Sequence, residues 1–388
     1  MSKVLRRQDI IFDDKDRALS HDVSMLGALI GELIREQGGD ELFEFVENVR
    51  LRSIRRREGN EKPSEKLATL LKNIDLPLVT EVIRSFSTYF QMANIAEKVH
   101  RIRRRREYLQ ETGQYQPGSL EETFVKLKAA SFDLDALQKL LNQINIEPVF
   151  TAHPTEPTRR TILRKEQNIV RRLIDMLNPT MTRQETHVCL ENIKLEVTTG
   201  WQTDEHPSEQ MTVADELEHV LFFITDVLYP AIPPFYEDIE NAVVRVYGEK
   251  GQHLHIPDLI SFASWVGGDM DGNPNVNGKI IRATMARQRS LILDRYYKEC
   301  GKLSVKLSQS HNRITVDELI TKKINEYSHI FPNAYHDVPS RHRDMPYRIF
   351  LRLIQQRLQA TYDDDVYPYE GVNQFEADIC LIEKSLVA

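Results

Sequence analysis

Apolar residues recur at helical spacing along most of this 388-residue chain, and this periodicity constrains the fold more than any other feature of the sequence. The first such stretch runs from Val23 to Ile34, and the glycine pair Gly38-Gly39 ends it. The same spacing predicts further helices over 66–71, 76–92 and 134–144. We therefore expect a mainly α-helical protein.

A longer helix is predicted to begin at Thr212. Thr212 and Asp215 have the spacing of a capping box, in which an N-cap hydroxyl and an acidic side chain three residues later satisfy two backbone amides. The apolar pattern then continues to Leu228. We expect this helix to end before Pro230, because proline interrupts a helix interior.

Two segments depart from the helical pattern. Residues 146–150 and 260–266 are short and apolar, and each is followed by a polar turn rich in Gly or Pro and then by a helix. This order is typical of a β/α barrel, in which functional side chains gather at the carboxyl ends of parallel strands. We expect a helical region over 1–145 and, over 146–388, the first strand–helix units of an elaborated TIM-like barrel with helical insertions. Two units cannot close a barrel, which needs eight, so either other strands are hidden in this sequence or they belong to chain that is not here. We expect the barrel to be incomplete in this chain.

The polar turn after 146–150 contains the candidate catalytic residue, His153. Pro154 and Pro157 restrict the residues before them to extended conformations, which keeps His153 out of the following helix. An imidazole at the end of a strand is suited to general acid–base chemistry near neutral pH. A histidine held in the core for structural reasons is the alternative.

The helix after this turn is predicted to start near 155–158, which places Arg159 and Arg160 in its first turn. Cations there oppose the helix dipole. A bound anion would explain them, because a helix amino terminus with two guanidinium groups attracts phosphate or carboxylate. The alternative is that both arginines pair with acidic side chains elsewhere in the fold.

The polar turn after 260–266 carries two carboxylates, Asp269 and Asp271. An EF-hand calcium loop is excluded, because its sixth and twelfth positions would be Pro274 and Ile280 instead of Gly and Glu. A phosphate-binding P-loop is excluded by the spacing of the glycines. What remains is a sharp turn whose carboxylates either support an active site or pin the turn itself.

Composition excludes several classes of function. The net charge of −7 argues against nucleic-acid binding through a basic surface, and the arginine runs 55–57 and 103–106 are interpreted as solvated helix faces rather than polyanion sites. Cys189, Cys300 and Cys380 form no CxxC pair, which is typical of a reducing compartment. The amino terminus lacks the apolar core of a signal peptide, and no apolar run has membrane-spanning length. We expect a cytoplasmic protein with neither a membrane nor a nucleic-acid partner.

The stretch FTAHPTEPTRR at 150–160 resembles the histidine signature of phosphoenolpyruvate carboxylases nearly letter for letter. Three further segments are similar to landmarks of that family and occur in the family's order: DVSMLGALIG at 22–31, WQTDE at 201–205 and SWVGGDMDGNPNV at 264–276. Met270 stands where the family usually has Arg, which removes a charge and five donors and puts an anion-binding role at that position in doubt.

The resemblance implies a lyase that fixes carbon dioxide, forming oxaloacetate and phosphate from phosphoenolpyruvate and bicarbonate with Mg²⁺ or Mn²⁺. Its product would supply four-carbon acid to the tricarboxylic acid cycle. By resemblance, His153 would take the carboxyl proton of a carboxyphosphate intermediate. The complete enzyme is expected to be an allosteric homo-oligomer, a tetramer.

The resemblance also implies roles for residues around the histidine. Arg159 and Arg160 match arginines that bind phosphate-bearing activators such as glucose 6-phosphate, so we assign them effector binding. Thr155, Asp269 and Asp271 are expected to support the active-site loops.

Much of the family's active site has no counterpart in this sequence. The family's metal-binding carboxylates, catalytic lysine and glycine-rich loop lie in a portion beyond the resemblance, so no metal ligand is assigned in this chain. The chain alone is therefore expected to be an inactive fragment. Two alternatives belong to other classes: a non-catalytic helical scaffold or regulatory module, and a phosphohistidine-forming transferase with His153 as the nucleophile.

Overall fold

The structure is a computed structural model, and it describes residues 13–57, 63–72, 74–110, 115–151, 158–204, 211–268 and 275–387. These residues are mainly helical, with two short parallel strands, as expected. The chain divides into two compact units. Unit 1 comprises Met1–Ile146, His153–Met211 and Pro233–Ser261, and unit 2 comprises Glu147–Ala152, Thr212–Ile232 and Phe262–Ala388. The expected regions 1–145 and 146–388 stay a prediction.

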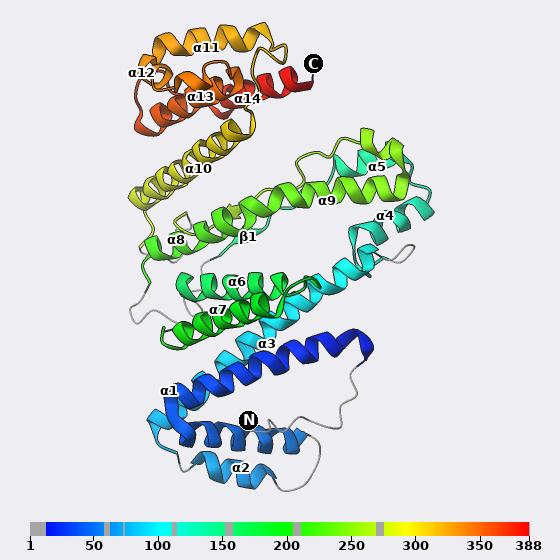
Figure 1. Ribbon diagram of the computed structural model, residues 1–388, viewed down its shortest axis with the longest axis vertical. Coiled ribbons are helices and arrows are strands. Elements are labelled where there is room, and N and C mark those ends of the chain that lie inside the picture. The colour runs from blue at the N-terminus through cyan, green and yellow to red at the C-terminus, as the bar shows by residue number, and fades with distance from the viewer. Residues whose placement is uncertain are drawn as a thin grey trace. The chain divides into compact units, whose positions relative to one another are not determined.

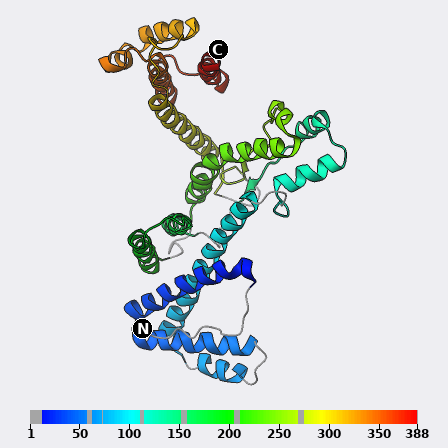
Figure 2. The same ribbon diagram turned by 45° about the vertical axis from the view of Figure 1, so that its right-hand side comes forward.

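Unit 1 is built on two long helices, α1 (Arg17–Arg57) and α3 (Leu76–Gln110), which pack against each other (Figure 1). Figure 2 shows the dark-blue α1 crossing the cyan α3. Their facing apolar side chains form the core, in which Leu26 and Val99 are almost completely buried. At Gly39 the backbone is not helical, with a φ of 81° and a ψ of 172°. The glycine pair thus breaks the helix as predicted, but the helix resumes at once.

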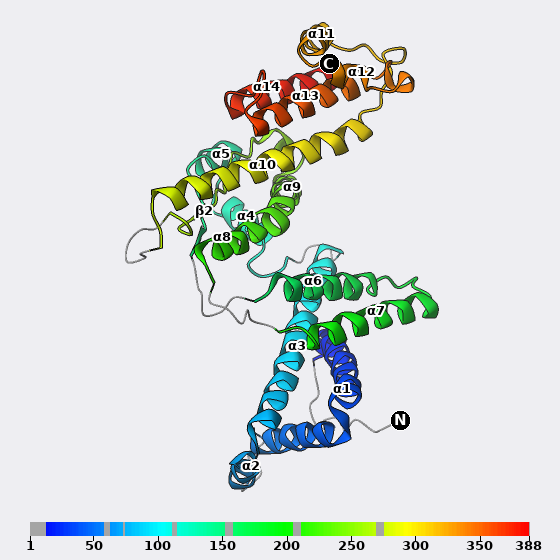
Figure 3. The ribbon, with the colours of Figure 1, turned by 90° about the vertical axis from the view of Figure 1, so that its left-hand side faces the viewer.

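Two shorter helices extend this core. α6 (Arg160–Asp175) and α7 (Arg183–Trp201) lie side by side, and α6 also contacts α3 (Figure 3). Ile169 of α6 and Ile193 of α7 belong to the same buried cluster as the α1–α3 core. The short 3₁₀ helix η1 (Asp14–Asp16) and α2 (Pro63–Lys72) contact α1.

A second apolar cluster of unit 1 joins α4, α5 and α9. Leu137, Ala242 and Val243 are completely buried within it. The elements of this part are α4 (Leu120–Ala129), α5 (Leu134–Leu141), α9 (Tyr229–Tyr247) and the 3₁₀ helix η3 (Glu249–His253).

Unit 2 contains the only sheet among the described residues. β1 (Val149–Phe150) and β2 (Ala263–Ser264) pair in parallel, with Val149 opposite Ala263 and Phe150 opposite Ser264. An isolated parallel bridge in unit 1, between Ile146 and Ile260, has the same register. Both predicted strands are therefore confirmed and are neighbours, whereas the barrel itself stays a prediction.

The helical body of unit 2 packs around α13 (Pro346–Asp363). Tyr327, Tyr347 and Phe350 are completely buried in its core. Figure 3 shows α10 along one side of α13. The other elements are α10 (Gly278–Lys306), α11 (Glu318–Ile330), α12 (Pro332–His336), the 3₁₀ helix η4 (Ser340–His342) and α14 (Val372–Val387). Among the described helices of both units, none combines the length and apolar character that a membrane span requires.

The helix predicted from Thr212 is correct at its start and wrong at its end. α8 (Val213–Phe222) begins with the capping box, because Thr212 Oγ1 accepts a hydrogen bond from the Asp215 backbone and Asp215 accepts one from the Thr212 backbone. A π-helical segment, η2 (Phe223–Leu228), then leads directly into α9, so the chain stays helical through Pro230. A proline removes one N–H donor, and carbonyls left without that donor can bond one residue further on, as in a π-turn.

Candidate functional site

The two predicted polar clusters follow β1 and β2. Because these strands run parallel, their carboxyl ends lie at the same edge of the pair. The Trp265 backbone N–H donates to the Phe150 carbonyl over 2.9 Å, which extends the pairing by one residue beyond β2. Four predicted site residues of these clusters lie outside the described residues, so their mutual geometry stays a prediction: His153, Thr155, Asp269 and Asp271.

A glycine fixes the turn after β2. Gly267 has a φ of 77°, and a Cβ on it would lie 2.3 Å from Oγ1 of Thr284 in α10. The Gly268 N–H closes the turn by donating to the Trp265 carbonyl over 3.0 Å. Only a residue without a side chain allows this conformation and this approach to α10.

The start of α10 is fixed as well. Oδ1 of Asn277 accepts hydrogen bonds from the backbone amides of Lys279 and Ile280, over 3.0 and 3.2 Å, and so caps the helix. Val266, just before the glycine turn, is buried against α8 beside Leu221. The described residues on both sides of 269–274 are therefore held in place by α8 and α10.

Two ion pairs connect α10 with the α8–η2 segment. The guanidinium of Arg287 donates to both carboxylate oxygens of Glu218, and this hydrogen bonding raises the pKa of Arg287. Arg295 likewise pairs with Asp226 of η2. Neither pair has a signal in the sequence, because the partners are far apart in the chain.

The structure places Arg159 and Arg160 at the amino terminus of α6. Arg160 is the first helical residue, and Arg159 is the N-cap, with an extended ψ of 136°. The helix thus begins slightly later than predicted, because the backbone at Arg159 is still extended. Both side chains are half-buried and take part in interactions within the chain. The first turn of α6 contains no acidic residue, and an anion site at this position stays a prediction.

Polar contacts fix α6 against α7. Nζ of Lys165 donates to the hydroxyl of Thr199 and, over 3.4 Å, to Glu196. Asn168 donates to the other oxygen of the same carboxylate over 2.8 Å. The orientation of α6 behind its two arginines is therefore set by side chains that no sequence pattern singled out.

The described part of the WQTDE segment has a structural role. Trp201 is buried in the α1–α3 core, and the guanidinium of Arg84 lies over its ring, 5.6 Å from the centroid. Arg84 also approaches Asp204, over 3.9 Å. Packing thus accounts for the tryptophan of this landmark.

Three arginines of the run on α3 pair with carboxylates. Arg103 donates to Asp22 of α1 over 2.7 Å, and Arg105 donates to Asp238 of α9 over 2.7 Å. Arg104 pairs with a glutamate on its own helix. These contacts agree with a helix-face role rather than a polyanion site, although Arg103 is largely buried instead of solvated.

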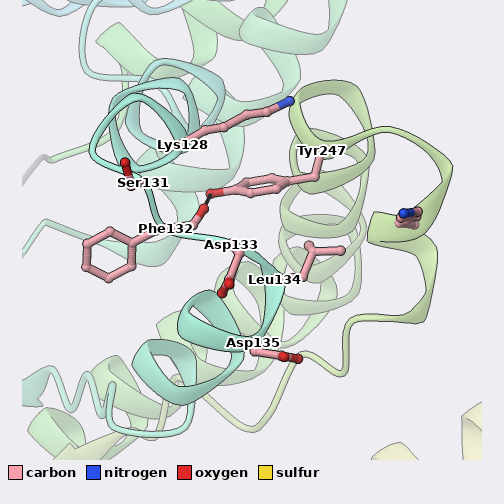
Figure 4. A pocket seen from close by; sticks show the side chains of 8 residues that line it. Lys128, Ser131, Phe132, Asp133, Leu134, Asp135 and Tyr247 are labelled. Carbon is pink, nitrogen blue, oxygen red and sulfur yellow. Dashed lines mark hydrogen bonds between the residues drawn. The ribbon is translucent and has the colours of Figure 1, made fainter.

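A surface pocket lies beside α4, α5 and the end of α9 (Figure 4), and its lining includes none of the predicted site residues that the structure describes. The hydroxyl of Tyr247 donates to the Phe132 carbonyl over 3.0 Å, and burial raises the pKa of this tyrosine. Nζ of Lys128 donates to the Val246 carbonyl over 2.6 Å. Both of these polar groups therefore bond to the backbone.

The described residues contain no metal centre. No group of three or more His, Cys, Asp or Glu among them is arranged to hold a metal ion.

The chain is similar to known proteins over nearly its whole length. The family model for phosphoenolpyruvate carboxylase matches residues 19–379. Curated phosphoenolpyruvate carboxylases of Xanthomonas euvesicatoria pv. vesicatoria (strain 85-10) and Xanthomonas campestris pv. campestris (strain 8004) are 43% and 42% identical over 383 residues, which is 98% of this chain. A phosphoenolpyruvate carboxylase of Ralstonia nicotianae is 35% identical over 354 residues, 89% of this chain. The chain spans 42% of the length of the two Xanthomonas relatives and 35% of the Ralstonia one. Because the family match extends over nearly all of its residues, this chain belongs to the phosphoenolpyruvate carboxylase family.

Proposed function

We propose that this chain is the histidine-bearing portion of an enzyme that forms oxaloacetate and phosphate from phosphoenolpyruvate and bicarbonate. The observation that carries the proposal is the parallel pairing of β1 with β2. The histidine signature follows one strand directly, and the GGDMDG turn follows the other. In parallel β/α architectures, groups at neighbouring strand ends act on one substrate. We further propose that β1 and β2 are the first strands of a TIM-like barrel.

His153 has the central chemical role in this proposal. A neutral imidazole accepts the carboxyl proton of carboxyphosphate near pH 7, which releases carbon dioxide for capture by the enolate. Thr155, Asp269 and Asp271 support the loops that position this imidazole. Mg²⁺ or Mn²⁺ supplies charge stabilisation in the complete enzyme, but the described residues do not fit a metal site, and we assign the metal to no residue of this chain.

Further properties follow from the same proposal. Arg159 and Arg160 bind a sugar-phosphate activator at the amino terminus of α6, which places regulation and catalysis on the same strand–helix unit. The complete enzyme is cytoplasmic and homo-oligomeric, a tetramer, and its oxaloacetate feeds the tricarboxylic acid cycle. The 388-residue chain alone has no carboxylase activity, because one proton transfer contributes only about 10²–10⁴-fold.

The proposal is tested by coupling oxaloacetate formation to its reduction. The chain alone is expected to give no turnover with phosphoenolpyruvate, bicarbonate and Mg²⁺. Co-expression with the part of the Xanthomonas euvesicatoria relative that this chain does not match is expected to restore turnover. His153→Ala should abolish the restored activity.

Two results would contradict the proposal. Restored turnover that survives His153→Ala in folded protein would remove the histidine from the chemistry. Stable transfer of phosphate from phosphoenolpyruvate to His153 would assign it the role of a nucleophile instead.

A further inference from the structure

One face of helix α10 contacts the elements that support the two strand ends. Its residues follow one another at intervals of three or four, so their side chains lie on the same side of the helix: Thr284, Arg287, Leu291 and Arg295. The face begins where Thr284 meets Gly267 in the turn after β2. Further along, α10 contacts α8 (Figure 3).

A small apolar cluster packs against the ends of both strands. Leu221 of α8 and Val266, shortly after β2, are buried in it. Phe150 of β1 and Leu291 of α10 pack against this cluster and are partly buried. Phe150 is the first residue of the histidine signature, and Val266 immediately precedes the GGDMDG turn. The cluster therefore joins the starts of both site segments to α8 and α10.

Two ion pairs lie on either side of Leu291. Arg287 of α10 donates through Nε and Nη2 to the two carboxylate oxygens of Glu218 in α8. Arg295 donates to Asp226 of η2. The two arginines are eight residues apart on α10, and the two acidic residues are eight residues apart on the α8–η2 segment. Both segments therefore run in the same direction, and the two ion pairs share one register.

These ion pairs can fix what the apolar cluster cannot. Apolar contacts are non-directional, so Leu291 alone would allow α10 to rotate or slide against α8. A guanidinium–carboxylate pair has a defined geometry, and two of them along one helix fix both its rotation and its axial position. The side chains of both pairs are partly exposed, so their contribution to global stability should be small.

We propose that Glu218 and Asp226 are positioning residues for the proposed reaction. Through Arg287 and Arg295 they fix α10 in register with α8–η2, and α10 in turn holds the turn after β2 beside the end of β1. They act through these arginines and not on the substrate. The inference rests on the proposed function, because the two segments that it aligns are the histidine signature and the GGDMDG turn.

Hydrogen exchange in the 388-residue chain tests the structural part of this inference. Glu218→Gln and Asp226→Asn should each lower the protection of the Gly268 amide and of the first turn of α10 by about twofold to fivefold, and the double variant by about tenfold. The reason is that each variant removes a charge that keeps α10 in register. Glu299→Gln is the matched control, because Glu299 of α10 pairs with Lys302 on its own helix.

Steady-state kinetics test the catalytic part. The enzyme is this chain co-expressed with the part of the Xanthomonas euvesicatoria relative that it does not match, in the coupled oxaloacetate assay. The double variant Glu218→Gln/Asp226→Asn should lower kcat by about tenfold and leave the KM for phosphoenolpyruvate unchanged, because misplaced groups lose interactions made in the transition state. Each kcat is measured well below the melting temperature of its variant, so that loss of folded enzyme does not contribute.

Reversal of one pair provides the rescue. Glu218→Arg alone places two cations against each other and should lower kcat further than Glu218→Gln does. The double variant Glu218→Arg/Arg287→Glu restores opposite charges and should recover most of that loss. Glu299→Gln should leave kcat unchanged.

The outcomes separate this inference from the proposed function. Absence of turnover in the unaltered co-expressed enzyme would contradict the proposed function, and hydrogen exchange would then decide whether the two pairs hold the turn. Unaltered enzyme that turns over, together with an unchanged kcat in Glu218→Gln/Asp226→Asn, would overturn the positioning role. Protection of the Gly268 amide that falls no more than in Glu299→Gln would overturn it as well.

Discussion

Gly267 and Thr284 lie so close together that no side chain fits between them. A Cβ on Gly267 would lie 2.3 Å from the threonine hydroxyl oxygen and 3.2 Å from its Cβ. The glycine also has a φ of 77°, which L-residues with a side chain rarely adopt. This contact joins the turn after β2 to α10, and so connects the strand end to the helix that follows residues 269–274.

Gly267→Ala is therefore expected to loosen the start of α10. The left-handed conformation alone costs about 1 kcal/mol for alanine, and the clash with Thr284 adds to it. Gly118→Ala is the matched control, because Gly118 also has a φ of 77° but nothing lies within 4 Å of its Cβ position. Hydrogen-exchange protection near each glycine measures how much local stability each substitution removes. Equal losses at both sites would show that the contact with Thr284 is unimportant.

Of the polar contacts of unit 2, a buried ion pair is the one whose disruption is expected to destabilise the fold most. Nη1 of Arg357 lies 3.6 Å from Oδ2 of Asp378, and the two side chains are only 7% and 5% exposed. The hydroxyls of Tyr327 and Tyr369 both donate to the same carboxylate oxygen over 2.7 Å. Burial, together with this carboxylate, raises the pKa of both tyrosines, so they stay protonated donors.

Arg357→Met should lower the free energy of unfolding by about 3–5 kcal/mol, because it leaves the charge of Asp378 buried without a cation. The double variant Arg357→Met/Asp378→Asn should recover part of that loss. Lys298→Met is the control: it removes an exposed pair with Asp294 and is expected to change stability by less than about 1 kcal/mol. Urea unfolding followed by circular dichroism gives all three values. A loss at Arg357 no larger than at Lys298 would refute the buried-pair argument.

The sequence predicted those parts of the fold that depend on local rules. Thr212 and Asp215 form the expected capping box because its geometry involves only neighbouring residues. The two strands were predictable because a short apolar run that ends in a Gly- or Pro-rich turn is too short for a buried helix. The strand–turn–helix order of both segments indicated parallel strands, and in the structure the two strands pair in parallel.

Helix ends were predicted less well, because the prediction relied on apolar residues at helical spacing and the polar end of a helix has none. The prediction for α3 stopped at 92, whereas the helix continues to Gln110 through its arginine run. Arginine and glutamate are good helix formers, and pairs such as Arg101 with Glu97 stabilise this end of the helix. The π-helical segment before Pro230 had no sequence signal beyond the proline itself.

The candidate site was predictable only as a motif. His153 was identified by resemblance, and its surroundings stay a prediction. Contacts that position the neighbouring elements, such as Gly267 with Thr284 and Arg287 with Glu218, join residues that only the tertiary fold brings together. No periodicity or spacing rule applies to them.

The three cysteines are expected to differ sharply in reactivity. Cys300 is only 3% exposed, and burial raises its pKa to about 12, so little of the reactive thiolate exists near neutral pH. Cys189 is also buried, whereas Cys380 is partly exposed. Iodoacetamide followed by peptide mapping should therefore label Cys380 first in the folded protein and all three cysteines in urea. Labelling of Cys300 as fast as that of Cys380 would contradict the burial of Cys300.

The capping box of α7 is expected to make the stability of that helix depend on pH. The Thr182 backbone N–H donates to Oε2 of Glu185 over 2.8 Å, and the Thr182 hydroxyl lies at the same distance from that oxygen. The backbone hydrogen bond, followed by that of the hydroxyl, lowers the pKa of Glu185 from 4.5. Because the pKa is lower in the folded state, the ionised carboxylate stabilises the fold above the unfolded pKa. That contribution is lost as the pH falls through the folded pKa.

Glu185→Gln should therefore unfold at a lower temperature than wild type near neutral pH, and the difference should shrink as the pH falls below the unfolded value of 4.5. Glu191→Gln is the matched control, because Glu191 is an exposed glutamate in the middle of the same helix. Its effect near neutral pH should be smaller, since it lies away from the helix terminus and caps no backbone amide. Thermal unfolding of the three proteins by circular dichroism, from about pH 7 to about pH 3, gives the comparison. A deficit of Glu185→Gln that stays constant over this range would mean that the charge of Glu185 does not stabilise the amino terminus of α7.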